Sequence, residues 1–447
     1  MVLRSVFQRL RPHFVFVAVL PFVLALTIAA DAQAPAPMPS QICPGNDSRA
    51  VLCTLLADPQ NRLPLGPDAL NDIRNFYADR NFDIAWSGPQ ADAALEALAH
   101  ADADGLDPLD YRPAGMTGES PAEHDVLLTA AILRYARDLR LGRVKESERG
   151  DSVDLPAVYF DAGHELSAAL QRGGVAQFLA AQRPQEPEYA RLAQALAQYR
   201  QSGDTEHAER VIANMERWRW MPRPLESRYI MANEAASELD VVDNGTVILT
   251  SRVIVGRPSM PSPIIRAEVR GIIVNPPWNV PPNIARREIL PKGRHYLAAH
   301  GFVWRGNGQI QQRAGAHSAL GRVKLDMPNG FNVYLHDTPG KALFARDNRN
   351  LSHGCIRVQA ILPLAGIVVA GNADEGQPEV EAAITRHATR EILAPVEIPV
   401  YFSYWTAIAD DNGDVRFYPD VYGRDARLLE LLHRSTSQRV SLAAPEQ

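Results

Sequence analysis

The spacing of apolar residues changes near Gly203, and this change divides the chain into two kinds of structure. Before it, apolar residues recur at intervals of three and four, as one face of a helix requires. After it, apolar residues alternate with polar or small ones, as in a half-buried strand. Because 447 residues exceed what one hydrophobic core usually spans, we expect an α+β fold, with a helical domain followed by a mainly β domain.

The helical spacing is clearest in two stretches, each followed by a glycine where a C-terminal cap belongs, Gly142 and Gly203. The spaced residues are Leu128, Ile132, Tyr135 and Leu139, and then Tyr189, Leu192, Leu196 and Tyr199. We therefore predict a helical scaffold domain over residues 68–203. Its aspartates do not have the spacing of a calcium loop, so we expect them in a solvated loop. They are Asp102, Asp104, Asp107 and Asp110.

The second half carries strand signals. Asp243-Asn244-Gly245 is a strong hairpin turn between two alternating runs. Further strand-like runs follow at 272–274, 333–335 and 399–404, interrupted by one predicted helix at about 379–391. We predict a single mixed, mainly β domain over residues 204–432 and a polar, frayed tail over 433–447.

The N-terminus has the layout of an export signal. Arg4, Arg9 and Arg11 precede a stretch without charge from residue 12 to residue 30, which ends on Ala30-Asp31-Ala32. We expect residues 1–32 to be a secretory signal peptide or a membrane anchor and residues 33–67 to be a linker. The body of the protein is then expected in the periplasm, outside the cytoplasm.

Charge and cysteine content narrow the function. A net charge of −6 without a basic stripe argues against a nucleic-acid partner. Three cysteines in an oxidising compartment leave one thiol unpaired. Cys43 and Cys53 lie ten positions apart and are expected to form a disulfide. Cys355 is then either a buried structural thiol or a catalytic thiolate.

Two short motifs carry the candidate chemistry: Asn-Val-Tyr-Leu-His-Asp-Thr-Pro at residues 332–339 and Ser-His-Gly-Cys-Ile-Arg at residues 352–357. Alternation in the first places Tyr334 and His336 on one face of a strand. In the second, Gly354 permits a tight turn whose amides can point at a reacting carbonyl oxygen. A thiol with a pKa near 8.5 needs a base or a cation beside it. The candidate bases are His336 and His353, and the candidate cation is Arg357.

Two other chemistries fit the same residues less well. Ser352 and His353 could act as a serine hydrolase pair, but adjacent residues in an extended turn point apart. His336, His353 and Cys355 could bind zinc, but they lack a fourth ligand and the paired spacing of structural zinc sites. We therefore predict neither a metal nor a diffusible cofactor.

The two motifs, with a histidine and a cysteine 19 positions apart, resemble the active-site signature of L,D-transpeptidases with a YkuD catalytic domain. The resemblance is strongest to the large gram-negative branch of the YcbB type, in which a helical scaffold domain accompanies the catalytic domain. It extends over most of residues 68–430. Further stretches that resemble this branch lie at residues 214–220, 275–281, 288–291 and 318–321.

The resemblance implies acyl transfer between peptidoglycan stem peptides. Cys355 would attack the donor stem, and the thioester would pass to the amine of an acceptor diaminopimelate. His336 would be the base, oriented by the backbone carbonyl of Asp337. The amides of Gly354 and Cys355, aided by Tyr334, would hold the oxyanion. The expected substrate-binding residues are His353, Arg357, Ser352, Trp278 and Asn279, and carbapenems are the expected inhibitors.

The sequence differs from the YcbB-type branch in two ways, and the second affects which crosslink is expected. The small peptidoglycan-binding module common between the two domains has no room here, and the lid over the cleft, residues 291–313, is short. Because lid contacts select the stem peptide, both 3-3 and 1-3 crosslinks remain open. Two alternatives to transpeptidation also remain: an L,D-carboxypeptidase or endopeptidase, and a non-catalytic scaffold that binds the cell wall.

Overall fold

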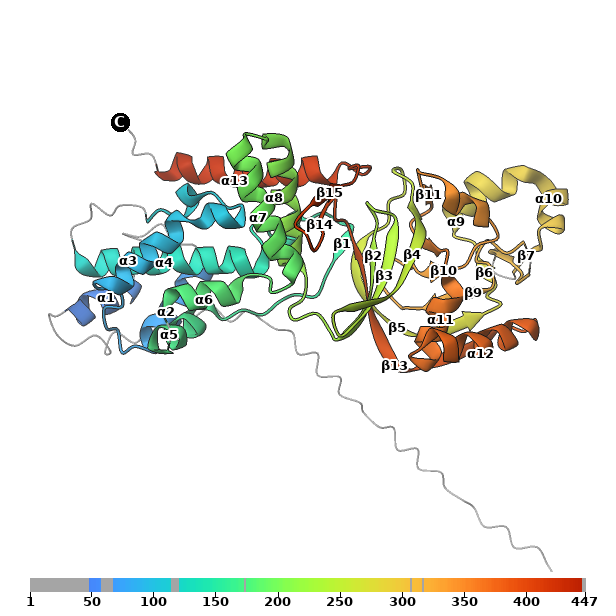
Figure 1. Cartoon of the computed structure of the whole chain (residues 1–447), viewed down its shortest axis with the longest axis horizontal. Coiled ribbons are helices and arrows are strands. Elements are labelled where there is room, and N and C mark those ends of the chain that lie inside the picture. The colour runs from blue at the N-terminus through green and yellow to red at the C-terminus, as the bar shows by residue number, and fades with distance from the viewer. Residues whose placement is uncertain are drawn as a thin grey trace, which may run out of the picture. The chain divides into compact units, whose positions relative to one another are not determined.

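The structure is a computed structural model that describes residues 48–57, 67–113, 120–172, 174–305, 308–315 and 317–443. The expected signal or anchor, Cys43, and residues 33–47 and 58–66 of the expected linker therefore lie outside the described residues. For residues 48–57 the linker expectation is wrong, because they form a helix whose Leu52, Leu55 and Leu56 are buried in the core of the helical region. Within those ranges, no helix is both long and apolar enough to cross a membrane. The predicted α+β class is confirmed, since helices dominate up to residue 220 and strands dominate after it (Figure 1).

Helix α4 (Pro121–Leu141) lies in the core of the N-terminal region. Its four predicted apolar positions are all buried, and Gly142 follows its last residue with φ of 84°. Ser120 begins the helix by accepting a hydrogen bond from the Glu123 amide at 3.2 Å. The surrounding helices are α1 (Ser48–Ala57), α2 (Pro67–Ala78), α3 (Pro89–Ala99), α5 (Ala162–Arg172), α6 (Val175–Gln182) and α7 (Pro187–Ser202), with 3₁₀ turns η2 (Ala101–Asp104), η3 (Pro108–Tyr111) and η4 (Glu146–Glu148).

The aspartates expected in a solvated loop divide into two kinds. Asp102 is exposed, but Asp104 and Asp110 are buried. Asp104 accepts hydrogen bonds from Arg183 at 2.8 Å and from the Tyr135 hydroxyl at 2.6 Å. The expectation of a solvated loop is therefore wrong for these two residues, because cationic and phenolic partners from distant helices make their burial possible.

The predicted boundary between residues 203 and 204 falls within a continuous core. Helix α8 (Thr205–Trp220) packs against α7, and Trp218 stacks on Trp405 of the β region with ring centres 4.4 Å apart. A short strand, β1 (Val153–Asp154), leaves the helical region and pairs in parallel with β5 (Ile264–Val274). The position of the domain boundary remains our proposal.

The main sheet closes on itself. Strand β9 pairs with β10 and also with β5, so that the order β5-β13-β2-β3-β4-β12-β10-β9 returns to β5. The predicted hairpin at residues 243–245 is confirmed, with φ of 49° at Asn244 and 77° at Gly245. The strands are β2 (Arg228–Asn233), β3 (Glu238–Asp243), β4 (Thr246–Gly256), β5, β9 (Val323–Asp326), β10 (Leu335–His336), β11 (Asn350–Ser352), β12 (Ile356–Val358) and β13 (Arg390–Ser403).

Two helices pack against this sheet, where one was expected. Helix α11 (Ile361–Ala370) shares the sheet's apolar core and crosses α12 (Ala373–Thr385) closely. A Cβ on Gly376 would lie 2.1 Å from the Gly366 carbonyl oxygen, so the crossing requires a glycine. The helix predicted at 379–391 is thus shifted, because its last residues already belong to β13.

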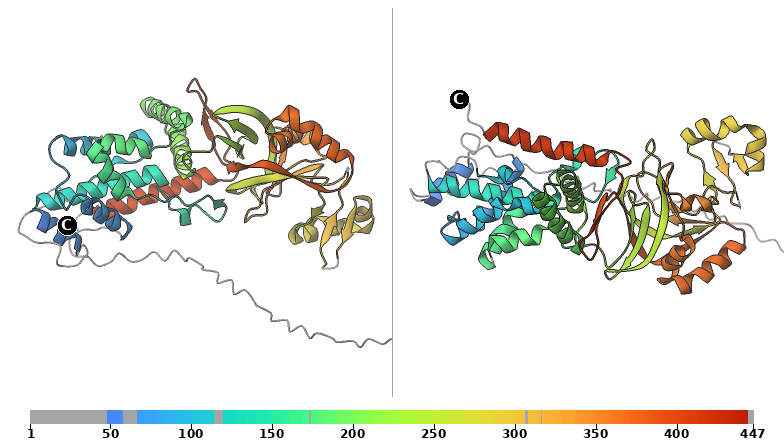
Figure 2. Two further views of the ribbon diagram at one scale, coloured as in Figure 1. Left: turned by 90° about the horizontal axis from the view of Figure 1, so that it is seen from below. Right: turned by 45° about the horizontal axis from the view of Figure 1, so that its top comes forward.

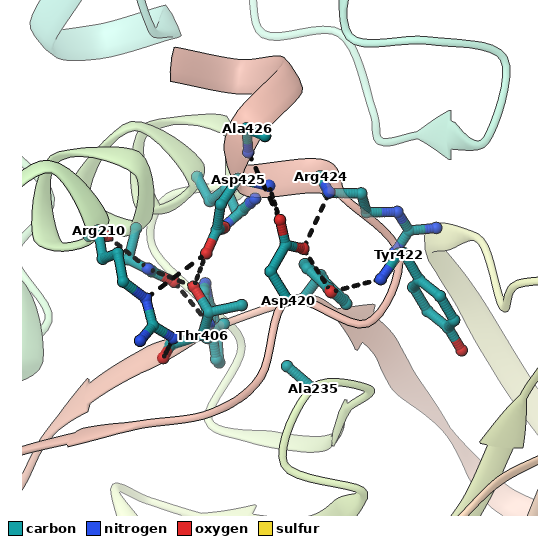
Figure 3. A network of polar contacts seen from close by, with 12 residues as sticks. Arg210, Ala235, Thr406, Asp420, Tyr422, Arg424, Asp425 and Ala426 are labelled. Carbon is teal, nitrogen blue, oxygen red and sulfur yellow. Dashed lines mark hydrogen bonds and ion pairs between the residues drawn. The ribbon is translucent and has the colours of Figure 1, made fainter. Parts of the chain in front are cut away.

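The C-terminal tail, expected to be frayed from residue 433, is helical as far as Ala443. After the small pair β14 (Ala407–Ala409) and β15 (Val415–Phe417), helix α13 (Arg424–Ala443) runs through it. Polar contacts hold the first turn of α13 (Figure 3). Asp420 accepts from the amides of Arg424 and Asp425, each at 2.9 Å, and the Thr406 hydroxyl donates to Asp425 at 2.6 Å.

The lid expected at residues 291–313 is part of a longer segment, residues 278–313, which we call the lid segment; it projects from the strands (Figure 2) and has its own small apolar cluster. Its strand β8 lies between β6 and β7, and a π-helical turn follows α9. The elements are β6 (Trp278–Asn279), α9 (Pro282–Ile284), η5 (Ala285–Ile289), η6 (Leu290–Lys292), α10 (Gly293–Ala299), β7 (Phe302–Trp304) and β8 (Ile310–Gln312); a 3₁₀ turn, η7 (Lys341–Ala345), lies outside it.

Candidate active site

The turn that carries Cys355 is fixed by hydrogen bonds to its backbone. Gly354 has φ of 108°, a conformation that favours glycine. The Ser352 hydroxyl donates to the Cys355 carbonyl at 2.5 Å and accepts from the Gly354 amide at 3.2 Å. From a distant loop, the Ser262 hydroxyl donates to the Gly354 carbonyl at 2.7 Å. The turn therefore presents Cys355 at the start of β12 in one defined orientation.

Strand register gathers the chemical groups on one face of the sheet. Strand β10 is parallel to β12, with Leu335 opposite Ile356 and His336 opposite Arg357. Leu335 and Ile356 point into the core and are fully buried. Because successive side chains alternate, residues 334, 336, 355 and 357 face the other way, towards the cleft. The strand-like run predicted at 333–335 is shifted, since β10 comprises only Leu335–His336 and Asn332 has φ of 54°.

The thiol of Cys355 is largely surrounded by protein. Both the backbone and the hydroxyl of Tyr334 hydrogen-bond to it, and burial raises the pKa of Cys355 above its ordinary value. The positive charges of Lys324 and Arg357 act against that rise. Since desolvation is the largest effect, the resting group is a protonated thiol rather than a preformed thiolate.

His336 is held as a neutral imidazole. Its Nδ1 lies 2.5 Å from the carbonyl oxygen of Asp337, so Nδ1 carries the proton and Nε2 is left as the basic nitrogen. The ring is 4% exposed, and burial, assisted by the charge of Arg357, lowers the pKa of His336 to about 3. The Asp337 carboxylate is engaged elsewhere, accepting from the Arg322 amide at 2.8 Å and from Lys341 at 2.6 Å.

Lys324 is a site residue that sequence reasoning missed. It lies directly opposite His336 in the antiparallel pair β9–β10, and its ammonium stands 4.1 Å from the ring centre of Tyr334. Burial lowers the pKa of Lys324, while the charges of Asp326 and the Cys355 thiolate favour its protonated form. The alternation of buried Val323 and Leu325 with Lys324 and Asp326 is the signal that could have placed it on the cleft face.

His353 is tied to the lid segment. Its Nε2 lies 2.8 Å from each carboxylate oxygen of Glu288, and Arg257 donates to the same carboxylate at 2.8 Å. Glu288 and Arg257 were also missed, because 65 positions separate Glu288 from His353 and neither motif contains them. The lid is thus fastened next to the nucleophile by an ionic contact.

A cleft of about 510 Å³ opens above the thiol. The lid contributes Trp278, Tyr296, His300 and Phe302 to its walls, and the sheet contributes the two motifs, including Ser352, His353 and Arg357. The hydroxyl of Tyr334 lies between the thiol and the Trp278 side chain, with hydrogen bonds to both. An apolar cleft with a few convergent polar groups is the usual form of a small-molecule site.

Two expected residue roles need correction. Asn279 does not line the cleft, because its Oδ1 accepts from Gln311 at 2.7 Å within the strand pair β6–β8. The Gly354 amide, expected to stabilise an oxyanion, donates to Ser352. The Cys355 amide and the Tyr334 hydroxyl are the remaining donors of the expected set.

The alternative chemistries find little support in the geometry. The hydroxyl of Ser352 bonds to the backbone of its own turn, while His353 bonds to Glu288, so the two do not form a hydrolase pair. In the described ranges, no group of three His, Cys, Asp or Glu residues is placed to hold a metal ion. Cys355 is a free thiol, whereas Cys53 is disulfide-bonded.

Two family models and one curated protein sequence match parts of this chain. A family model described as the L,D-transpeptidase catalytic domain matches residues 227–383, and a scaffold-domain model matches residues 71–196. A putative L,D-transpeptidase from Haemophilus influenzae is 33% identical over 224 residues, which cover 44% of this chain and 45% of that protein. The chain thus matches less than half the length of this curated relative.

Solved structures resemble the chain only distantly. An L,D-transpeptidase from Mycobacterium smegmatis has 13% identity and a TM-score of 0.22, covering 40% of this chain and 58% of that one. An L,D-transpeptidase from Enterococcus faecium has 12% identity and a TM-score of 0.21, covering 40% and 50%. Scores this low carry no conclusion about activity.

Proposed function

This chain belongs to the L,D-transpeptidase catalytic-domain family through residues 227–383 and to the scaffold-domain family through residues 71–196, and from this premise we propose that it crosslinks peptidoglycan stem peptides through a thioester on Cys355. One observation carries the proposal. A free thiol, a neutral imidazole and a half-buried phenol share one sheet face beneath the cleft, to whose walls the lid segment contributes.

The first half-reaction would acylate the enzyme. The Cys355 sulfur attacks the carbonyl carbon of an L,D peptide bond in the donor stem, and its proton passes to Nε2 of His336. The Cys355 amide and the Tyr334 hydroxyl stabilise the developing oxyanion. When the tetrahedral intermediate collapses, His336 returns the proton to the departing amine of D-alanine, which leaves a thioester.

The second half-reaction would transfer the acyl group. The side-chain amine of an acceptor diaminopimelate attacks the thioester, and Nε2 of His336 takes a proton from that amine. Cys355 leaves as a thiolate and recovers its proton from His336. No net proton or electron is gained or lost, and the carbonyl of Asp337 keeps the imidazole in the tautomer that both steps need.

The low pKa of His336 is compatible with its proposed role as the base in both half-reactions. An imidazole that stays neutral at physiological pH is always available as a base, although it is a weak one. Because burial also raises the pKa of Cys355, proton transfer would accompany attack rather than precede it. The cations Lys324 and Arg357 would then stabilise the sulfur as it becomes negative.

Hydrolysis is the second candidate for the same site. If water resolved the thioester, the enzyme would be an L,D-carboxypeptidase or an endopeptidase. The apolar walls of the cleft, from Trp278, Tyr296 and Phe302, favour exclusion of water and hence transfer to an amine. The short lid leaves both 3-3 and 1-3 crosslinks as products of the proposed reaction.

The remaining parts of the proposal concern place and partners. The N-terminal layout supports a periplasmic location, with peptidoglycan stems as donor and acceptor and a role in cell-wall organisation and cell shape. A cysteine that forms thioesters would also react with carbapenems, because their strained amide acylates a thiol held near an oxyanion site.

Mass spectrometry of disaccharide-peptide fragments incubated with the chain tests the proposal. Crosslinked dimers with the wild type, and none with Cys355→Ala, are expected, and fragmentation of the dimers assigns the 3-3 or 1-3 bond. Shortened monomers without dimers would replace transpeptidation by hydrolysis. Dimers formed equally by Cys355→Ala would remove Cys355 from the reaction, and unchanged fragments in both samples would favour the non-catalytic wall-binding scaffold.

A further inference from the structure

A second pocket, of about 290 Å³, is lined in part by Pro258 and Pro261, which lie in the loop between β4 and β5. We call it the arginine pocket, because Arg149, Arg217, Arg424 and Arg427 line it together with Trp220 and Tyr422. It shares no lining residue with the catalytic cleft. Its lining contains four arginines and no aspartate or glutamate, but Arg424 pairs with Glu234 at 2.7 Å and Arg427 with Glu430 at 2.9 Å, and both of these carboxylates lie outside the lining.

Arg149 is the least compensated of these cations. Its guanidinium donates to the carbonyls of Val144 at 3.2 Å and Leu141 at 2.6 Å and lies 4.9 Å from the Trp220 ring, and no described carboxylate pairs with it. The nearby Glu216 is already engaged, accepting from the Val144 amide at 2.8 Å and from Arg219 at 2.9 Å. A cation in this setting favours the approach of an external anion.

Arg217 supplies an unused donor. Its side chain is only 4% exposed, and its Nη1 lies 2.6 Å from Asp425 Oδ1, while its Nη2 is buried without a hydrogen-bond partner among the described residues. Buried donors are nearly always paired, so an unpaired guanidinium nitrogen in a pocket wall points to a missing acceptor. Two oxygens on one ligand would suit the planar fork of an arginine.

The rest of the wall is rigid and largely apolar. Val144, Ile264, Leu428 and Leu431 line it, and the Tyr422 hydroxyl donates to the Gly256 carbonyl at 2.5 Å. Figure 3 shows how the contacts of Asp420 hold the turn that carries Tyr422 and Arg424. A volume of this size corresponds to roughly ten water molecules, enough for a small organic molecule.

We propose that the arginine pocket binds a small organic anion, in which a carboxylate or phosphate group meets Arg149 and Arg217 and an apolar body contacts Trp220. A carboxylate, which is planar, and a phosphate, which is tetrahedral, can both accept two hydrogen bonds from the N–H groups of a guanidinium. The site is distinct from the catalytic cleft and goes beyond crosslink formation.

Calorimetric titration of the full chain tests this proposal with three probes of similar shape: benzoate, phenyl phosphate and neutral benzamide. Saturable binding of at least one anion and none of benzamide is expected, and the preferred anion identifies the carboxylate or phosphate source. Equal binding of benzamide, or binding of neither anion, would overturn the proposal.

Ser152 provides matched variants, because it lines the pocket, is half-buried, and makes no side-chain hydrogen bond to the arginines among the described residues. Ser152→Asp places a carboxylate in the wall that competes for the guanidiniums, and should weaken the anion by at least about tenfold. Ser152→Asn keeps the shape without the charge and should bind like the wild type. Arg149→Met should also lose binding without leaving a carboxylate unpaired. Wild-type affinity in both Ser152→Asp and Arg149→Met would contradict the site.

Discussion

The ammonium of Lys324 stands 4.1 Å from the ring centre of Tyr334, the residue whose hydroxyl bonds to the Cys355 thiol. A cation on the ring face is attracted by the electron density of the phenol. The ammonium of Lys324 also brings positive charge near the Cys355 sulfur. This contact links the strand β9 to the reaction proposed for Cys355.

Lys324 should therefore lower the pKa of Cys355. In Lys324→Met, loss of this charge should raise that pKa further and slow alkylation of the thiol at pH 7 by about three- to tenfold. The pH dependence of iodoacetamide labelling measures it. Lys324→Arg should keep the wild-type profile, and a profile unchanged in Lys324→Met would show that the lysine acts only in packing.

The hydroxyl of Tyr334 should matter for acylation more than for binding. Tyr334→Phe removes one donor to the thiol and to the oxyanion, and a loss of about 10²–10³-fold in the acylation rate is expected. Stopped-flow measurement of carbapenem acylation gives this rate. Tyr159→Phe, at an 88% exposed position outside the cleft, is the control. If Tyr334→Phe acylated within about twofold of the wild-type rate, the Tyr334 hydroxyl would not be a donor to the oxyanion.

Glu288 should hold the lid closed. Glu288→Gln removes the charge shared by His353 and Arg257, and hydrogen exchange of residues 282–289 should become faster. The Glu288 carboxyl has a pKa lowered by these two partners, so the wild-type lid should remain protected as pH falls until that carboxyl is protonated. Glu430→Gln, on the exposed part of α13, is the control. Equal exchange in both variants would mean that packing alone positions the lid.

Burial of His336 predicts how stability depends on pH. Its folded-state pKa of about 3 lies below the unfolded value near 6.5, so in that interval the unfolded chain binds the extra proton and stability falls as pH falls. From pH 6.5 to pH 5 the loss from this group should be about 2 kcal/mol. Urea unfolding at both pH values should show that loss in the wild type and a smaller one in His336→Asn, whose amide can still donate to the Asp337 carbonyl.

The exposed His295 provides the comparison for that measurement. His295→Asn makes the same change of residue type at an exposed position outside the pair of His336 and Asp337, and it should retain the whole pH dependence of the wild type. If His336→Asn also retained it, the folded-state pKa of His336 would not be depressed.

Local patterns in the sequence predicted much of the fold. The spacing of Leu128, Ile132, Tyr135 and Leu139 gave α4, and Asn244-Gly245 gave the β3–β4 hairpin, because both signals depend on near neighbours. The extent of helix α13 was missed because its buried residues Leu428, Leu431 and Leu432 all lie in its first half, while the sequence after Leu432 is mostly polar. Burial of Asp104 could not be foreseen, since its partner Arg183 lies 79 positions away.

The same limit applies to the site. Tyr334, His336, Cys355 and Arg357 could be grouped from the sequence because they lie in two short motifs, and the pairing of β10 with β12 places all four on one face of the sheet. The roles of Lys324 and Glu288 depend on the register of β9 and on the lid, neither of which a local pattern determines. For the same reason the Gly354 amide was assigned to the oxyanion, although Ser352 occupies it.

The central claim, a thioester on Cys355, is tested most directly by intact-mass spectrometry of the enzyme mixed with a donor stem peptide in the absence of an acceptor. The account predicts one added acyl mass that maps to the peptide containing Cys355, disappears when an acceptor amine is supplied, and is absent from Cys355→Ala. An adduct on another residue, or crosslinked product formed by Cys355→Ala, would contradict it.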